Sequence, residues 1–270
     1  MEANQRARLA AWRAQRDAGR AAELSAHLET EARGSRNLMP VLIACVEGGL
    51  TVGDSAVFDY LNPDVPPGLR LLDVPLVRAA AKSLKGYGEV VRDPKKHRIE
   101  IVPWPLTGWR RLDAGTGIEG GTTEGIFACE WKGNELIGRN EAVGGHYVIG
   151  FRDQPETARP GVKLSEGRVL LWHCNYHPDG GQLFWPLDGR PFVVPVSLPG
   201  DDLKPEAFKA FWSDGSFGIY IHPGVWHEGV FPVNPTGRFF DKQGKVHARV
   251  SCDLAREFGV LLAVPLPHSL

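Results

Sequence analysis

The segment from Asn175 to Gln182 combines residue types that suit proton transfer and substrate binding. Asn175 and His177 are two positions apart, so on a strand their side chains share one face. Gln182 follows across a glycine-rich turn and can return to that face. Histidine exchanges a proton near neutral pH because its unperturbed pKa is about 6.5, whereas the neutral amides offer only hydrogen bonds. His173, four positions before His177, can share the same face.

A second segment, from Gly218 to Glu228, carries two more histidines around a tight turn. Tyr220 and His222 share a strand face, and a Pro-Gly turn then returns the chain to His227. Imidazoles on either side of one turn can act as acid and base on opposite sides of a single small molecule. Glu228 either adds an acid/base group to this site or points outward, since neighbours on a strand alternate.

The remaining histidines and one glycine-rich loop carry weaker signals. A single histidine on a strand is usually structural or at the surface, which is the prediction for His97, His247 and His268. The loop 120–125 lacks the lysine and the following helix of a phosphate-binding loop. It therefore predicts a hairpin or lid, from which Glu124 could reach a pocket.

The composition excludes several classes of protein. The chain has 270 residues and a formal net charge of -1, and its basic residues form no cluster interleaved with aromatics, so no nucleic-acid partner is expected. Its four cysteines include no Cys-x-x-Cys pair, which excludes a zinc ribbon and favours free thiols in a reducing cytosol. No apolar run approaches the ~20 residues needed to span a bilayer, and the start of the chain lacks the apolar core of a signal peptide. We therefore expect a cytoplasmic location without membrane contact.

The composition and the hydrophobic pattern of the sequence change near residue 38. Residues 2–33 are rich in Ala, Arg and Glu and lack Pro, which predicts a helix. Its thin apolar stripe, which includes Leu9 and Trp12, suits either packing on a partner subunit or a solvated arm. Beyond it, short apolar runs, beginning with 39–49, alternate with Gly, Pro and Asp turns and predict an all-β sandwich or barrel. Short helices are predicted at 76–84 and 204–212.

The two histidine segments resemble the two motifs of the cupin family. The first cupin motif runs His-x-His, then Glu, then Gly, and Asn175, His177, Gln182 and Gly189 keep this spacing. The second motif has Gly, a turn with Pro and Gly, and then His, an order that residues 218–227 follow.

The cupin resemblance also bears on metal binding. In metal-bearing cupins these positions hold a divalent ion, which implies His177, Gln182 and His227 as ligands. Asn and Gln replace the first His and the Glu of the motif, so no carboxylate charge helps to hold a metal. The resemblance thus leaves open one divalent ion of the Ni, Zn or Mn type, or none.

Longer stretches are similar to the ureidoglycolate lyase family. Residues 177–194 carry His-Pro, Gln, Phe-Trp-Pro, Gly and a Val-rich run in the order of that family. Residues 220–227 carry its Tyr, His and Val-Trp-His steps, and residues 75–91 carry its Pro-Leu and Tyr-Gly-Glu-Val-Val pattern. Segments 1–70 and 100–165 look like additions beyond the compact members of the family.

This resemblance implies a mainly β fold of the cupin type, a β-barrel or jelly roll, with an N-terminal helix and one or two short further helices. It divides the chain into a helical arm, 1–36, and a single barrel domain, 37–270, with core motifs at 73–92 and 170–265. Cupins of this family commonly pair through their barrel edges, which hides exposed strands, so a homodimer is expected.

The resemblance further implies a lyase of purine or allantoin breakdown that cleaves ureidoglycolate, or a related small carbinolamine acid, to glyoxylate and urea. The catalytic residues it implies are His222, His227 and His177. The substrate-binding residues it implies are Gln182, Asn175, Tyr220, Trp226 and Glu228. An arginine should hold the substrate carboxylate by a two-pronged contact, and the sequence does not choose among Arg98, Arg110, Arg111 and Arg249.

Two other functions fit the same motifs. One is a metal-dependent cupin isomerase, hydrolase or dioxygenase acting on another small acid. The other is a non-catalytic cupin that binds a small acid or sugar. Metal analysis separates the first of these from the lyase, and release of glyoxylate or urea identifies the lyase itself.

Overall fold

The computed structural model describes residues 17–32, 37–50, 59–106, 108–113, 115–117, 120–159, 161–245 and 247–267. The chain forms two compact units, Met1–Phe58 and Asp59–Leu270. The predicted domain boundary, between 36 and 37, lies before this division. No helix in the described part of the chain is long and apolar enough to cross a membrane.

The first unit contains two helices, α2 (Ala18–Ala32) and α3 (Met39–Glu47). Leu24 packs against Val41 and Cys45 in a small apolar cluster. Helix α2 falls within the predicted helix 2–33, whereas the predicted stripe residues Leu9 and Trp12 lie outside the described residues.

The prediction of a β-type run over 39–49 is wrong. Pro40 stands in the first turn of α3, where its fixed φ and missing N–H are tolerated. Val41 and Cys45 are four positions apart, so they share one face of a helix and are buried together. Apolar β-branched residues suggested a strand, but their spacing fits helical packing.

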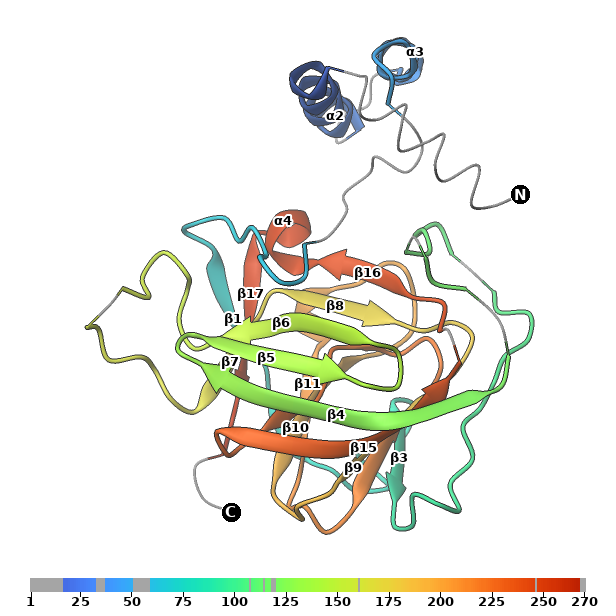
Figure 1. Ribbon diagram of the computed structural model, residues 1–270, viewed down its shortest axis with the longest axis vertical. Coiled ribbons are helices and arrows are strands. Elements are labelled where there is room, and N and C mark those ends of the chain that lie inside the picture. The colour runs from blue at the N-terminus through green and yellow to red at the C-terminus, as the bar shows by residue number, and fades with distance from the viewer. Residues whose placement is uncertain are drawn as a thin grey trace. The chain divides into compact units, whose positions relative to one another are not determined.

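The second unit is built from two β-sheets (Figure 1). Ten strands of the described residues form the larger sheet, in the order β1 (Arg70–Asp73), β17 (Val260–Pro265), β7 (Arg168–Leu171), β6 (Gly145–Phe151), β5 (Glu135–Asn140), β4 (Thr122–Lys132), β15 (Thr236–Gly244), β9 (Gln182–Pro186), β12 (Gly218–Ile221) and β3 (Gly88–Val91). The smaller sheet has the order β16 (Val250–Asp253), β8 (His173–Tyr176), β13 (Trp226–His227), β10 (Phe192–Ser197), β11 (Lys209–Ser213) and β2 (Leu76–Arg78), with β14 (Phe231–Pro232) paired to β10. Short helical turns are η2 (Pro205–Ala207) and α4 (Leu254–Phe258).

One apolar core lies between the two sheets. Phe192 on β10 of the smaller sheet and Phe239 on β15 of the larger sheet are buried with ring centroids 5.2 Å apart. Phe127 on β4 and Phe211 on β11 belong to the same cluster. Burial of such aromatic side chains from both sheets stabilises their face-to-face packing. The prediction of a mainly β fold is confirmed, and within the described residues neither sheet closes on itself.

Neither predicted helix of this unit forms as predicted, because strands and turns occupy most of both stretches. The helix predicted at 76–84 is wrong, because 76–78 form strand β2, which pairs in parallel with β11, and turns follow to residue 87. In the stretch 204–212, only η2 is helical, and β11 begins at Lys209. Ala210 and Phe211 are buried in register with β10, so pairing and burial override the local helical preference.

Candidate active site

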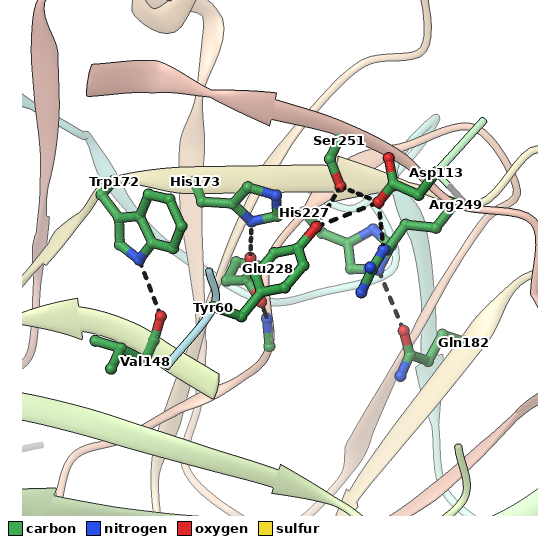
Figure 2. Close-up of polar contacts among 11 residues, drawn as sticks. Tyr60, Asp113, Val148, Trp172, His173, Gln182, His227, Glu228, Arg249 and Ser251 are labelled. Carbon is green, nitrogen blue, oxygen red and sulfur yellow. Dashed lines mark hydrogen bonds and ion pairs between the residues drawn. The ribbon is translucent and has the colours of Figure 1, made fainter. Parts of the chain in front are cut away.

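A cavity of about 670 Å³ opens between strands of both sheets. On β8 the alternating residues His173 and Asn175, followed by His177, face it. Gln182 on β9 and His227 on β13 line the same cavity. Alternation on β8 explains this placement, because successive side chains of a strand point to opposite faces. Trp172, one position earlier, instead donates its indole N–H to the carbonyl of Val148, 2.9 Å away (Figure 2).

Three imidazoles meet on one wall of the cavity. The ring centroid of His177 lies 5.3 Å from that of His227 and 4.2 Å from that of His247. Burial and mutual repulsion hold the pKa of His177 well below its usual value. Burial, followed by the neighbouring His227, lowers the pKa of His247 to about 3, and burial also lowers the pKa of His227. These shifts favour the neutral form of each ring, which is the form that can accept a proton.

The hydrogen bonds of these rings define their tautomers. A backbone carbonyl can only accept, so His177 donates through Nδ1 to Ala248 at 3.1 Å and keeps a lone pair on Nε2. His227 likewise donates through Nδ1 to the carbonyl of Val225 at 2.8 Å. The Nε2 of His247 accepts from the backbone N–H of Gly244. The Nδ1 of His247 has no partner among the described residues, but it carries the ring's hydrogen because Nε2 accepts. His177 is therefore the ring whose lone-pair nitrogen has no hydrogen bond to the described protein.

The residues do not fit the divalent ion that the resemblance implies. His177, Gln182 and His227 do line the cavity. However, the Nε2 of His227 lies 3.2 Å from the amide oxygen of Gln182, and the Nε2 of His247 is engaged by Gly244. Within the described ranges, no group of three or more His, Cys, Asp or Glu side chains is placed to hold a metal ion.

A cationic group stands at another part of the wall. Arg249 lines the cavity, and its Nε donates to the carboxylate of Asp113 at 2.6 Å (Figure 2). Ser251 donates to the same carboxylate oxygen at 2.6 Å, and the hydroxyl of Tyr60 lies 3.3 Å from it. The Arg249 guanidinium also lies over the Tyr60 ring, 4.7 Å from its centroid. These contacts hold Arg249 in one orientation.

Arg249 is the candidate arginine that the structure brings to the cavity. Arg98, Arg110 and Arg111 do not line it. Arg98 is exposed, and Arg110 is bound to Asp201 and to Glu257. Of the four candidates, Arg249 is the one that lines the cavity.

A buried histidine–carboxylate pair, His173 and Glu228, also lines the cavity. The Nδ1 of His173 lies 2.8 Å from the carboxylate of Glu228, and each side chain is only 4% exposed. The second oxygen of Glu228 accepts from the backbone N–H of Gly229 at 3.1 Å. Glu228 thus faces the cavity, the inward one of the two orientations left open by the sequence.

The prediction that His222 converges with His177 and His227 is wrong. Tyr220 and His222 do share a face, with rings 5.4 Å apart, but neither lines the cavity. Their neighbours Ile219 and Ile221 point into the core between the sheets. Tyr220 instead packs with Val91, Ile99 and Leu183 on the opposite side of β12. The alternation was correct, but the inward face belongs to the isoleucines.

Trp226 and Glu124 also lie away from the cavity lining. The indole of Trp226 is fully buried and donates to the carbonyl of Gly200 at 2.7 Å, as strand alternation places it opposite His227. Glu124 is exposed and pairs with Lys242 at 3.0 Å. Trp226 therefore belongs to the core, as a buried aromatic with a satisfied N–H.

Sequence reasoning assigned His247 a structural or surface role, but this side chain lines the cavity. Lys245, His247 and Arg249 alternate along the chain, and all three line the cavity. That period of two was a usable signal. Tyr60 and Asp113 carried no comparable signal, because they reach the site from segments distant in the sequence.

The depressed pKa of His247 predicts a pH-dependent stability. The folded pKa is about 3, whereas the unfolded chain binds this proton near pH ~6.5. Between these values the unfolded state holds more protons, so the free energy of unfolding falls as pH decreases. In His247→Gln we expect this fall to be smaller by up to ~1.4 kcal/mol per pH unit. Urea unfolding of wild type and variant at about pH 7, 6 and 5 measures it.

The exposed residue His146 supplies the control for this experiment. His146→Gln should follow the wild-type pH dependence. Equal slopes for His247→Gln and wild type would contradict a neutral, buried His247.

Comparison with known proteins finds similarity over the part of the chain that holds most of this cavity. Residues 137–255 match the family model described as ureidoglycolate lyase. The ureidoglycolate lyase of Pseudomonas syringae pv. syringae (strain B728a) is 41% identical over 96 residues, which are 35% of this chain and 55% of the relative. That of Azotobacter vinelandii is 38% identical over 79 residues, or 28% and 46%. That of Stutzerimonas stutzeri (strain A1501) is 41% identical over 70 residues, or 25% and 41%.

In the structure, residues 137–255 contribute strands to both sheets and include the histidines that line the cavity. Over this part the chain is similar to the ureidoglycolate lyase family, and the resemblance predicted from the sequence is confirmed. The chain spans about half the length of the curated relatives it matches. The matched region contains the histidines and Arg249, whereas Tyr60 and Asp113 lie outside it.

Proposed function

We propose that this protein is a carbon–nitrogen lyase that cleaves ureidoglycolate to glyoxylate and urea. The observation that carries the proposal is His177, a neutral imidazole with an open Nε2 in a cavity that also presents Arg249. The family match over the same residues supports this substrate. We also propose that the two sheets are a cupin-like jelly roll, an assignment supported by the cupin spacing of the residues that face the cavity.

The reaction requires one base and one acid. Ureidoglycolate is a carbinolamine, with urea bound to a carbon that also bears a hydroxyl and a carboxylate. The Nε2 of His177 takes the hydroxyl proton, the carbonyl of glyoxylate forms, and the C–N electron pair leaves on the urea nitrogen. His227, whose ring centroid is 5.3 Å from that of His177, enters this step protonated on Nε2 and gives that proton to the nitrogen. The proton on Nε2 of His177 then passes to Nε2 of His227, which restores both rings.

The remaining polar groups orient the substrate. Arg249 is held by Asp113 and carries the positive charge that a substrate carboxylate needs. The side-chain oxygen of Asn175 is buried and has no hydrogen-bond partner among the described residues. A buried acceptor without a donor is costly, and a ureido N–H would satisfy it. Gln182, which also lines the cavity, offers a second neutral amide to the ureido group.

A glyoxylate assay tests the proposal. Purified wild-type protein with ureidoglycolate should release glyoxylate far faster than the buffer does, with no added metal. No release above the buffer rate, with or without divalent ions, would reject ureidoglycolate as the substrate.

The size of the cavity favours a second, related substrate class. A cavity of about 670 Å³ falls within the range of ~300–1,000 Å³ that encloses drug-sized ligands, whereas ureidoglycolate is much smaller. The same chemistry accepts any amide in place of urea, as in α-hydroxyhippurate, which would give benzamide and glyoxylate. A higher kcat/KM for α-hydroxyhippurate than for ureidoglycolate would identify the larger class. No turnover of it would restrict the enzyme to ureidoglycolate.

Homodimer formation belongs to the same proposal. Helix α3 exposes an apolar stripe at helical spacing, formed by Met39, Leu42, Ile43 and Val46. Such a stripe supports association with a second copy, because water-exposed apolar surface is unfavourable. Light scattering of wild type and of Ile43→Glu should give a dimer and a monomer, and a monomeric wild type would contradict it.

A further inference from the structure

The larger sheet contributes a row of polar side chains to the cavity, from three neighbouring strands. Gln243 on β15 is in register with Gln182 on β9 at one side and with Thr123 on β4 at the other. Residues directly opposite each other on adjacent strands point to the same face of a sheet, and all three line the cavity. Thr123, Gln243 and Gln182 thus form a polar row.

Gln243 points inward because of its place on the strand. Phe239, four positions earlier on β15, is buried in the core between the sheets, so Gln243 lies on the same inner face. Lys242 lies on the outer face, where it pairs with Glu124. Gln243 is only 2% exposed, so it is a buried amide and not a surface glutamine.

The amide of Gln243 differs from its neighbours in the row, because it has no hydrogen-bond partner among the described residues. Both ends of the Gln182 amide are engaged, by His227 at 3.2 Å and by Asp241 at 3.0 Å (Figure 2 shows the contact with His227). The hydroxyl of Thr123 donates to the carbonyl of Ala142 at 3.1 Å, which leaves its oxygen as an acceptor only. A ligand that bonds both groups of the Gln243 amide therefore gains affinity.

The polar row adjoins the acid side of the proposed reaction. On β8, Asn175 is in register with β16 on one side and with His227 of β13 on the other. Arg249 lies directly before β16, so Asn175 separates it from His227. His227 contacts Gln182, the neighbour of Gln243 in the row. A substrate with its carboxylate at Arg249 and its leaving nitrogen at His227 therefore directs its remaining end toward Gln243.

The remaining end of ureidoglycolate is a carboxamide, with a carbonyl oxygen and a terminal NH₂ group. A primary amide pairs with it by two hydrogen bonds, because the NH₂ of Gln243 can donate to the carbonyl while its oxygen accepts from the terminal NH₂. The second hydrogen of that NH₂ suits the acceptor oxygen of Thr123. An amide that ends in a methyl group has no such donor and leaves both acceptors unpaired. A site built to bond a substrate N–H discriminates strongly against an analogue that lacks it.

We propose that Gln243 binds the terminal carboxamide of the ureido group and makes the enzyme select ureides over other N-acyl carbinolamine acids. This inference rests on the proposed lyase and adds the substrate class that its cavity prefers. The size of the cavity admits larger amides, but at the polar row it presents hydrogen-bonding groups to their outer end. Gln243 contacts the substrate away from the bond that breaks, so it determines specificity and takes no part in proton transfer.

The binding of two substrate analogues tests the inference without turnover. N-carbamoylglycine carries the carboxylate and the ureido group but lacks the hydroxyl, so it cannot be cleaved by this reaction. N-acetylglycine differs from it by a methyl group in place of the terminal NH₂. In calorimetry the wild type should bind N-carbamoylglycine about 10²-fold more tightly. Gln243→Met keeps the length of the side chain and removes both hydrogen-bonding groups, so it should reduce this ratio by about 10-fold or more.

Turnover provides a parallel comparison. N-acetyl-α-hydroxyglycine should release acetamide and glyoxylate by cleavage of the same bond. The preference in kcat/KM for ureidoglycolate over this compound should fall by about 10-fold or more in Gln243→Met. The KM for ureidoglycolate should rise while kcat stays nearly constant, because the contact is present before and during the reaction. Comparing the ratios of variant and wild type cancels any difference in reactivity between the two leaving groups.

Gln154→Met is the matched control, because Gln154 donates to the carbonyl of Leu69 and does not line the cavity. It should leave both ratios unchanged. A wild type that binds the two analogues equally, or binds neither, would overturn the inference whether or not the variant folds. So would unchanged ratios in a folded Gln243→Met. Failure of the lyase proposal is distinct, because it shows as no glyoxylate from a wild type that still selects N-carbamoylglycine through Gln243.

Discussion

His177→Ala should lower kcat by about 10²- to 10⁴-fold, the range expected when a positioned general base is removed. Its Nδ1 is committed to the carbonyl of Ala248, so Nε2 is the lone pair available to the substrate hydroxyl. His227 and His247 cannot replace it, because the Nε2 of His227 is engaged by Gln182 and the Nε2 of His247 by Gly244. Initial rates of glyoxylate release, with circular dichroism to verify folding, measure the effect.

His222→Ala is the matched control for that variant. His222 is a histidine of the same β domain, but it lies beside Tyr220 and does not line the cavity. We therefore expect its kcat and KM to stay within about twofold of wild type, since surface substitutions away from special features change little. A folded His177→Ala with wild-type turnover would refute the base assignment. A large loss in His222→Ala would show that the cavity described here is not where the chemistry occurs.

Arg249→Met should raise KM by about 10- to 100-fold, because hydrogen bonds to charged groups contribute about 1.5–3 kcal/mol each. The methionine keeps much of the side-chain volume and removes the positive charge. Removing Arg249 also deprives Asp113 of its ion-pair partner, although Ser251 still donates to that carboxylate. Kinetics should therefore be compared at a temperature well below the unfolding transition of the variant.

Arg98→Met provides the control, because Arg98 is an exposed arginine that does not line the cavity. Its KM should match that of wild type. Arg249→Lys should recover only part of the affinity, since an ammonium group lacks the two-pronged geometry of guanidinium. An unchanged KM in Arg249→Met would mean that another group holds the carboxylate.

The parts of the site that follow from strand alternation could be predicted from the sequence. His173, Asn175 and His177 are at a spacing of two and do share the cavity face. The same rule placed Tyr220 and His222 together but could not tell which face of β12 is inside. The buried isoleucines 219 and 221 decide that question, and their burial depends on what the opposite sheet offers.

Other features needed the three-dimensional structure. The Tyr60 and Asp113 side chains contact Arg249 from segments far away in the sequence, so no local sequence pattern predicts their place in the site. Asp241 follows two phenylalanines in a strand and has no motif neighbour, yet it is fully buried and accepts a hydrogen bond from Gln182. Local propensity predicted a helix at 76–84, where pairing of β2 with β11 prevails.

The most direct test of the account is the nitrogen balance of the reaction. Wild-type protein would be incubated with ¹⁵N-labelled ureidoglycolate, and the products followed by NMR without added enzymes. A lyase breaks only the bond between the carbinol carbon and nitrogen, so we predict glyoxylate and urea in equal amounts and no ammonia. Ammonia in place of urea would mean that the protein hydrolyses the ureido group, and would contradict the proposed C–N cleavage.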